Sequence, residues 1–213
     1  SDLYKIFGLS YANKQTICIM SSMIVSIYTE MTPNPETMKF VANKLLYPGK
    51  SIDFTEQDQT EPSPLAQELF GFPFVRGVFI ASNFVTLTKS PEALWEEIIP
   101  TVRQFLKAYL EEGKQVIIEE LVPEKKEDEI LINDSDKDVV TRIKEMLENY
   151  VKPAVEMDGG AISFRGYDDG VVKLMLQGSC SGCPSSMVTL KSGIEGMMKR
   201  MIPEVKEVVA EAE

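Results

Sequence analysis

The chain has 213 residues, room for one large domain or two small ones, and an ordinary globular composition with 44% hydrophobic and 26% charged residues. Its net charge of −11 disfavours nucleic acid as a partner, because phosphate binding needs a basic surface. The absence of histidine excludes Ser-His-Asp and Cys-His catalysis, histidine-ligated zinc and a histidine proton shuttle.

Cysteine content and hydropathy restrict the compartment. Three cysteines in this length do not form a secreted disulfide framework, and they indicate a reducing environment. No apolar run reaches the roughly 18 residues of a membrane span, so no membrane association is expected. The stretch ICIMSSMIVSI at 17–27 resembles the apolar part of a signal peptide, but it lacks a strongly basic flank and a small-residue cleavage site.

Composition shifts divide the chain into four predicted segments. These are an N-terminal extension over 1–22, a first domain over 23–115, an acidic linker over 116–134 and a second domain over 135–213. We interpret Cys18, in the extension, as incidental to function. The linker is acidic, contains Pro123 and shows little apolar periodicity after Val122. Both domains mix helices with short strands, which predicts two small domains of the α+β class.

The first domain is predicted to begin with a strand over 24–31, which is rich in β-branched residues. The TPNPE segment at 32–36 follows as a turn, because its two prolines block a regular strand ladder. The pattern over 36–46 is ambiguous between helix and strand.

The second half of the first domain carries clearer signals. A short helix over 63–71 is predicted from Ser63 at its cap and the following proline. A hairpin over 74–89 follows, with its turn near 81–83. A long helix over 90–113 has Ser90 as its expected cap, and Pro100 is expected to kink or split it.

The second domain is predicted as α-β-β-α-β. Its first helix is capped by Asp134 or Ser135 and runs through Asn149, and four residues share one of its faces: Val139, Ile143, Met146 and Tyr150. A hairpin over 161–178 turns at Asp169-Gly170. A helix over 184–202 and a strand over 205–210 complete the domain, and a Cys-x-x-Cys loop precedes its second helix.

That loop, QGSCSGCPSSM at 177–187, holds Cys180 and Cys183. Pro184 and the helical periodicity after it place Cys183 beside a helix N-terminus, where the helix dipole lowers the pKa of a thiol. Gly178 and Gly182 allow the backbone to turn. We therefore expect thiolates presented at the surface, in contrast to a structural cysteine buried among apolar contacts.

Several interpretations of the cysteine pair remain open on the residues alone. A zinc ribbon or a [4Fe–4S] cluster takes four ligands, and one chain offers only two in this motif. A symmetric dimer supplies two copies and thus four sulfurs. The alternatives are a thiol–disulfide oxidoreductase that uses the dithiol, and an interaction module with idle thiols.

The second domain closely resembles the NifU C-terminal (Nfu) domain. The resemblance rests on Asp158-Gly159-Gly160, on the hairpin, on GSCSGCPSS and on the following helix to IPEVKEV. YTEMTPNPETMKFVANKLL, SPLAQELFGFPFVRGVFIASNFVTLTK and the helix containing Trp95 resemble the Nfu N-terminal domain. Together the two likenesses cover nearly everything from 24 to 210.

The resemblance implies an iron–sulfur cluster carrier and no enzymatic turnover. Cys180 and Cys183 match the family's ligand positions, for a cluster shared between two subunits, with [4Fe–4S] favoured over [2Fe–2S]. The implied partners are a second copy of the chain on cluster binding, an upstream assembly scaffold and apo iron–sulfur client proteins. The further cysteine-bearing modules of the complete NifU protein are missing here, so a carrier fits better than a site of de novo assembly. The expected location is the bacterial cytoplasm, with the mitochondrial matrix as the alternative.

Three other features have structural interpretations that we favour. Asp158-Gly159-Gly160 is a helix-to-strand turn in which glycine supplies a positive φ. The methionines of the last helix fill a core or a partner groove. The TPNP segment is a rigid turn, and the resemblance suggests a docking or specificity role for its domain.

Overall fold

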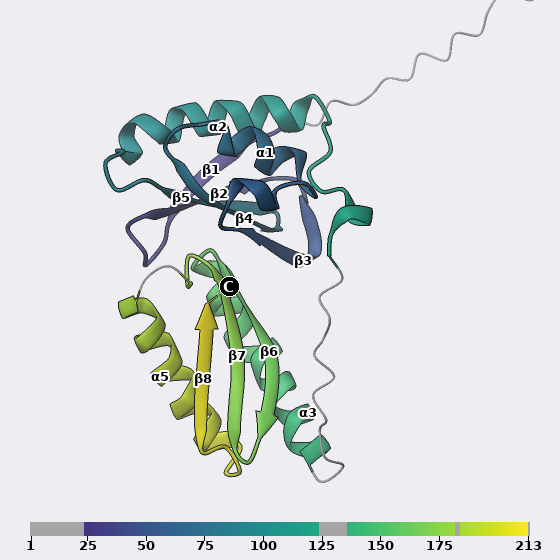
Figure 1. Cartoon of the computed structure of the whole chain (residues 1–213), viewed down its shortest axis with the longest axis vertical. Coiled ribbons are helices and arrows are strands. Elements are labelled where there is room, and N and C mark those ends of the chain that lie inside the picture. Colours follow the sequence, from purple (N-terminus) through teal and green to yellow (C-terminus); the bar gives the residue numbers. More distant parts are fainter. Residues whose placement is uncertain (1–23, 124–135, 182–183, 213) are drawn as a thin grey trace, which may run out of the picture.

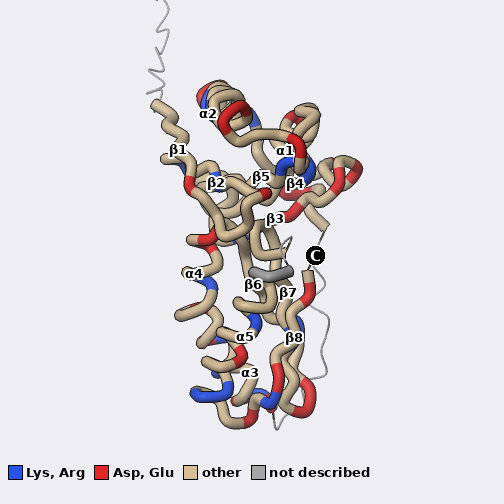
Figure 2. The backbone as a smooth tube through the Cα atoms, turned by 90° about the vertical axis from the view of Figure 1, so that its left-hand side faces the viewer, with Lys and Arg blue, Asp and Glu red and all other residues tan. Residues whose placement is uncertain are grey.

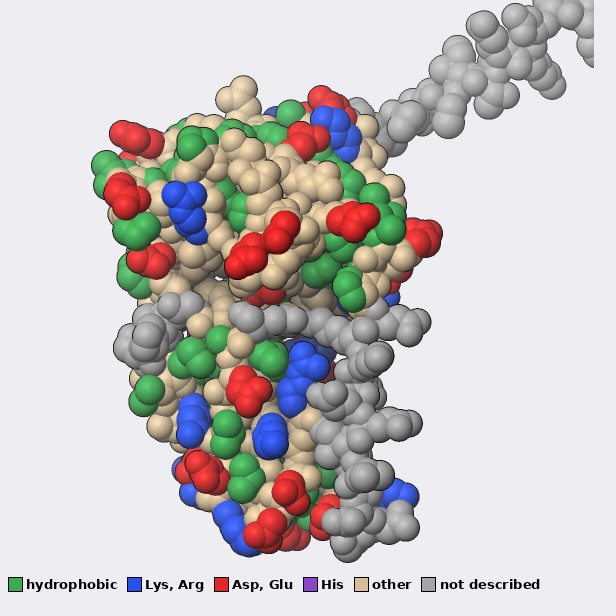
Figure 3. Space-filling view, viewed as in Figure 1, with side chains coloured by type: hydrophobic (Ala, Val, Ile, Leu, Met, Phe, Trp, Pro, Cys, Tyr) green, Lys and Arg blue, Asp and Glu red, His purple; other side chains and the backbone are tan. Residues whose placement is uncertain are grey.

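The computed structural model describes residues 24–123, 136–181 and 184–212, without the side chains of 184–186. The described chain forms two α+β domains that lie end to end (Figures 1 and 3). This agrees with the predicted fold class. None of the helices in the described ranges is long and apolar enough to span a membrane.

The first domain is a five-stranded antiparallel sheet with two helices on one face (Figure 1). The strand order is β1-β2-β5-β4-β3. The strands are β1 (Ile27–Met31), β2 (Thr37–Ala42), β3 (Tyr47–Phe54), β4 (Val75–Ser82) and β5 (Phe84–Lys89). The helices are α1 (Pro64–Phe70) and α2 (Trp95–Glu111), with 3₁₀ turns η1 (Gln57–Gln59) and η2 (Glu119–Leu121).

Strand β2 resolves the segment that was ambiguous in the sequence. All six of its residues are buried, so its side chains alternate between two covered faces. Met38, Phe40 and Ala42 join the main core of the domain, together with buried residues of α1 and α2. Lys39 and Val41 point to the opposite face, where a strand of an ordinary two-layer fold would meet water. The second face of this sheet is therefore also a contact surface.

The helix signals of the first domain are partly confirmed. Ser63 caps α1 as predicted, accepting the Ala66 N–H at 3.0 Å. The long helix, however, begins at Trp95 instead of near residue 90, so the prediction of Ser90 as its cap was wrong. Pro100 does not split α2, since a proline in the second turn removes only one backbone bond, to Glu96.

The start of the predicted linker packs on the first domain. Val116, Ile117 and Val122 are partly buried against its core, and Ile118 N–H donates to Pro62 O at 2.7 Å. Residues 124–134 lie outside the described ranges, as does the predicted extension over 1–22 with Cys18. The four boundaries remain a prediction.

The second domain places helices on one face of a three-stranded sheet, in the predicted α-β-β-α-β order (Figure 1). Its hairpin pairs β6 (Gly160–Asp168) with β7 (Val171–Gly178), and β8 (Glu207–Ala212) adds to β7 in parallel. The helices are α3 (Lys137–Met146), a π-helical turn η4 (Leu147–Val151), α4 (Lys152–Met157) and α5 (Pro184–Met201). Asp169 and Gly170 both have positive φ, +42° and +85°, which confirms the predicted tight turn.

The π-helical turn changes which residues of the first helix are buried. An α-helix that ended at Asn149 would place Tyr150 on the face of Val139 and Ile143. The wider turn at η4 shifts that face, so Leu147, Val151 and Val155 are buried. Tyr150 is 58% exposed, so the prediction that it shares the face of Val139, Ile143 and Met146 was wrong.

Charged residues are interspersed along the backbone of both domains (Figure 2). In the second domain several form ion pairs. Arg142 Nη2 lies 2.6 Å from Glu204, linking α3 to the segment before β8.

Candidate functional site

Cys180 lies where the β6–β7 hairpin meets the turn before β6. Gly178 ends β7, pairs with Gly160 and adopts a φ of +67°, which turns the chain across the start of β6. The chain then passes through Ser179 to Cys180, and α5 begins at Pro184. Cys183 lies outside the described residues, so its relation to Cys180 remains a prediction.

Cys180 is buried inside the second domain. It is 7% exposed and belongs to that domain's hydrophobic core. A Cβ added to Gly160 would lie 2.8 Å from its Sγ, so the sulfur packs against the bare backbone of Gly160. This corrects the expectation of a surface-presented thiol at position 180. No local sequence pattern indicates this burial, because the contact joins residues 20 positions apart.

Hydrogen bonds hold the backbone on both sides of Cys180. The Ser179 hydroxyl donates to Asp158 O, and Ser179 N–H donates to Gly159 O at 3.3 Å. On the other side, the Ser181 hydroxyl donates to Gly178 O at 2.9 Å. The loop is thereby fastened to the Asp158-Gly159-Gly160 turn, whose Gly159 has the predicted positive φ, +81°.

Burial raises the pKa of the Cys180 thiol above its usual value, because the apolar surroundings disfavour the thiolate. The Ser179 hydroxyl, 3.7 Å from Sγ, acts in the opposite direction, and the Asp158 carboxylate adds to the rise. In this arrangement Cys180 is a protonated thiol at neutral pH.

The raised pKa predicts a loss of stability in alkaline solution. A folded-state pKa above the unfolded value means that the thiol stabilises the fold fully below the unfolded pKa, near 8.5, and less as the pH rises through the folded pKa. We expect the free energy of unfolding of a Cys18→Ser/Cys183→Ser variant to fall above about pH 8.5. Urea unfolding across this pH range, with Cys180→Ala added as the comparison, measures the effect. An identical pH dependence with and without Cys180 would contradict it.

The contact between Cys180 and Gly160 makes a second prediction. Gly160→Ala would bring a Cβ to 2.6 Å from Gln177 O and 2.8 Å from the cysteine sulfur. We expect a loss of about 1–3 kcal/mol in the free energy of unfolding, because neither neighbour can withdraw without moving the loop. Gly196→Ala is the matched control: it lies in α5 with open space around it, and should be neutral or stabilising. Equal urea midpoints for the two variants would rule out the close contact.

The first domain also contacts this loop, through residues that sequence reasoning missed. Four side chains stand in register across its sheet, one each from β2, β5, β4 and β3, on the face away from the helices. We call them the cross-strand row: Lys39, Thr86, Phe79 and Asp53. No local signal in the sequence distinguishes them, because the same strands carry other polar and aromatic residues.

Each member of the cross-strand row contacts the end of the second domain that holds Cys180, formed by residues 157–160 and 178–181. We call this the cysteine end. Lys39 Nζ donates to Met157 O at 3.2 Å, and Thr86 Oγ1 donates to Gly159 O at 2.8 Å. Asp53 Oδ2 accepts the Gly178 N–H at 2.7 Å. A Cβ on Gly178 would lie 2.9 Å from the Phe79 ring, so the ring packs directly on this glycine.

The predicted TPNP turn lies at the same contact. Asn34 is 3% exposed, its Oδ1 accepts the Glu36 N–H at 3.0 Å, and its Nδ2 reaches Ser179 O at 3.5 Å. The interpretation as a rigid turn is consistent with this geometry. Of the methionines of α5, Met198 is fully buried, Met187 and Met197 are partly buried against the core, and Met201 is 50% exposed.

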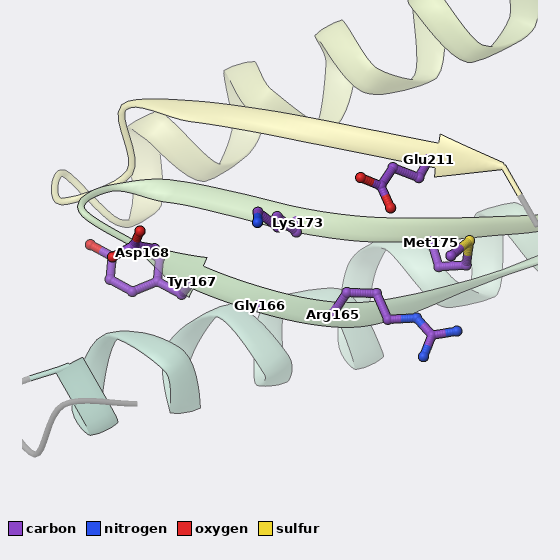
Figure 4. A pocket seen from close by; sticks show the side chains of 7 residues that line it. All are labelled: Arg165, Gly166, Tyr167, Asp168, Lys173, Met175 and Glu211. Atoms are coloured by element: carbon purple, nitrogen blue, oxygen red, sulfur yellow. The ribbon is translucent and has the colours of Figure 1, made fainter. Parts of the chain in front are cut away.

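A separate depression lies on the sheet face of the second domain opposite its helices (Figure 4). Arg165, Lys173, Met175 and Glu211 are among its lining residues. It is open to solvent, and within the described residues no group of three or more acidic or cysteine side chains is placed to hold a metal ion there or elsewhere.

Comparison with known proteins assigns both domains. The family "Scaffold protein Nfu/NifU N terminal" matches residues 27–113, and "NifU-like domain" matches 143–209.

Three relatives illustrate the similarity, each named "NFU1 iron-sulfur cluster scaffold homolog, mitochondrial". The protein from Drosophila ananassae is 40% identical over 202 residues, which are 94% of this chain and 69% of the relative. Those from Drosophila willistoni and Homo sapiens are 41% and 38% identical, covering 89% and 85% of this chain and 65% and 70% of the relatives. The chain thus spans about two thirds of the length of these relatives. With both domains matched and the Cys180 loop in the second of them, the chain belongs to the NifU-like (Nfu) family of iron–sulfur cluster scaffold proteins.

Proposed function

We propose that this chain carries a [4Fe–4S] cluster between the Cys180–Cys183 motifs of two subunits and delivers it to apo-proteins. The observation that carries the proposal is the Cys-x-x-Cys pair in the loop between β7 and α5 of a NifU-like domain. A four-thiolate cluster needs four sulfurs, and two copies of this loop supply them.

The chemistry of the donors supports an iron–sulfur cargo. The chain has no histidine, and it has no second Cys-x-x-Cys motif that would complete a zinc site within one subunit. Thiolates are the ligands that iron–sulfur clusters take. Each thiol loses its proton on binding iron, so loading is coupled to proton release.

Delivery would proceed by ligand exchange. An acceptor's thiolates replace the four cysteine sulfurs one after another, and the subunits separate once no ligand bridges them. The chain does not change the cluster's composition in this sequence, so its role is that of a carrier without enzymatic turnover. Its partners are an upstream scaffold that supplies the cluster and apo iron–sulfur proteins that accept it.

The rival function is a thiol–disulfide oxidoreductase that uses the Cys180–Cys183 dithiol. Thiol–disulfide exchange and cluster binding both need an accessible thiolate, so the burial and raised pKa of Cys180 do not separate them. Insulin reduction by the iron-free protein at a rate comparable to a thioredoxin would favour the rival.

Anaerobic reconstitution tests the proposed function. Iron, acid-labile sulfide and molecular mass are measured on the same sample after removal of unbound iron. We expect about four irons and four sulfides per dimer. A stable cluster on a strict monomer would contradict a site shared between two subunits. Two irons per dimer would indicate a [2Fe–2S] cluster instead of [4Fe–4S].

We also propose a mitochondrial location, because the three relatives carry that word in their names. The expectation of a bacterial cytoplasm finds no support in them. Fractionation of cells that produce the native chain, probed with an antibody against it, tests this.

A further inference from the structure

The cysteine end of the second domain is the surface that a second subunit must reach if a cluster is to be shared. In this structure the first domain of the same chain lies against that end (Figure 1). The same surface therefore has two candidate occupants, and the geometry of the contact shows how they interfere.

The cross-strand row hydrogen-bonds two backbone segments that lie next to Cys180. Thr86 bonds the carbonyl of Gly159, the neighbour of the glycine on which the sulfur packs. Asp53 bonds the amide of Gly178, two residues before Cys180. The first domain thus hydrogen-bonds the backbone next to Gly160 and the backbone two residues before Cys180.

An apolar patch that includes Phe79 of the row extends the contact. Val41, Phe79, Ala81 and Phe84 of the first domain form one buried cluster with Ala161 of the second. Ala161 directly follows Gly160, against which the Cys180 sulfur packs, so this patch also lies close to Cys180. With five residues, this cluster is much smaller than the main hydrophobic core of either domain. An interface of this kind, polar with a small apolar centre, permits domain movement.

The buried position of Cys180 is incompatible with a shared cluster. A sulfur that bridges to iron held by a second chain must face that chain, yet Cys180 is 7% exposed and packed on Gly160. The backbone beside this site, at Gly159 and Gly178, is hydrogen-bonded by the cross-strand row. Release of the row is the movement that would free the loop and clear the surface together.

We propose that the first domain and a second copy of this chain compete for the cysteine end of the second domain. In the closed form, the cross-strand row covers that end and keeps Cys180 buried. In the open form, the row has separated, the thiol is accessible, and a second subunit takes the vacated surface. The inference rests on the proposed function for its second step only, because closure by the row is independent of any cluster.

Thiol accessibility tests the closed form on the iron-free full chain. In a Cys18→Ser/Cys183→Ser background, Cys180 is the only thiol, and its alkylation by iodoacetamide is followed by mass spectrometry. Asp53→Ala/Thr86→Val removes two bonds of the row, each contributing a factor of about five to an equilibrium constant. We expect alkylation to accelerate by about tenfold or more, since the rate reports the open population.

Asp58→Ala/Thr101→Val is the matched control, because both residues are exposed and lie away from the contact. Its rate should stay within about twofold of the parent. Far-UV circular dichroism and Trp95 fluorescence verify that each variant is folded. If the double variant unfolds, the nearly isosteric Thr86→Val alone is expected to give about a fivefold acceleration. Equal rates for row variant and control, or for Thr86→Val and parent, would overturn the proposal.

Cluster-dependent dimerisation tests the second step, with all cysteines present. We expect Asp53→Ala/Thr86→Val to form the cluster-bearing dimer faster than the parent and at lower protein concentration. Faster alkylation with no cluster on any variant would refute the proposed function and leave the closed form standing. Cluster loading by the parent, with unchanged alkylation in the row variant, would refute the closed form and leave the proposed function intact. Faster alkylation with unchanged dimerisation would overturn the competition.

Discussion

Cys183→Ser and Cys180→Ser are each expected to abolish stable cluster binding. Either change leaves two thiolates at a dimeric site that needs four, and a serine hydroxyl does not ionise at neutral pH to replace them. Iron and sulfide after anaerobic reconstitution should fall from about four per dimer to near the background of protein without the motif. The visible absorption of the cluster should disappear with them.

Cys18→Ser is the matched control for these variants. It removes a thiol of the same chain outside the motif, and we expect full cluster content and an unchanged dimer mass. Full occupancy in Cys183→Ser would contradict the ligand assignment. Loss of cluster in Cys18→Ser would bring a third thiol into the site.

Phe79→Ala is expected to cause the largest loss of stability outside the main cores. The ring is 1% exposed, packs on Gly178 and lies 6.0 Å from the Phe84 ring, centroid to centroid. Truncation of a buried phenylalanine costs about 3–5 kcal/mol, because the lost contacts leave a cavity. Urea unfolding followed by the fluorescence of Trp95, the single tryptophan, reports the effect on the first domain.

Phe70→Ala makes the comparison for Phe79. Phe70 ends α1 on the helical side of the sheet and is only partly buried, so its truncation should cost clearly less. A loss below about 1 kcal/mol for Phe79→Ala would show that the domains are apart in solution for most of the time.

The second domain could be predicted largely from local signals. The Asp169-Gly170 pair defines the hairpin turn, and Pro184 begins α5 where the sequence predicts a helix. Gly178 turns the chain between them with a positive φ. Each of these signals acts within a few residues, so a single sequence is enough to detect it.

What the sequence did not predict depends on contacts between distant residues. Strand β3 begins at Tyr47 with a proline and a glycine, and its ladder with β4 is interrupted between Tyr47 and Ser51, so no regular alternation announces it. The burial of Cys180 depends on the missing side chain of Gly160, 20 residues earlier, and nothing near Cys180 in the sequence indicates this pairing. The motif predicted a helix-terminal thiolate, whereas the tertiary contact produces a protonated thiol at position 180.

The sequence indicates the candidate site as a loop and describes only the part of it that lies in the second domain. The Cys180–Cys183 spacing indicates thiol chemistry without reference to the fold. The contribution of Asp53 and Thr86 comes from strands more than 70 residues away in the chain, which pair so that both side chains stand on one face. Periodicity identifies such a face as polar or apolar, but it does not say what covers it.

The covered second face of the first sheet has a consequence for synthesis of the chain. The sheet is complete once β5 has left the ribosome, yet the loop that covers Phe79 and Phe84 is made about 90 residues later, on the order of ten seconds at ordinary translation rates. During that interval the nascent chain presents an aromatic patch to the cytosol. A chaperone that bound this patch on the nascent chain would occupy the surface that Gly178 contacts in the folded protein.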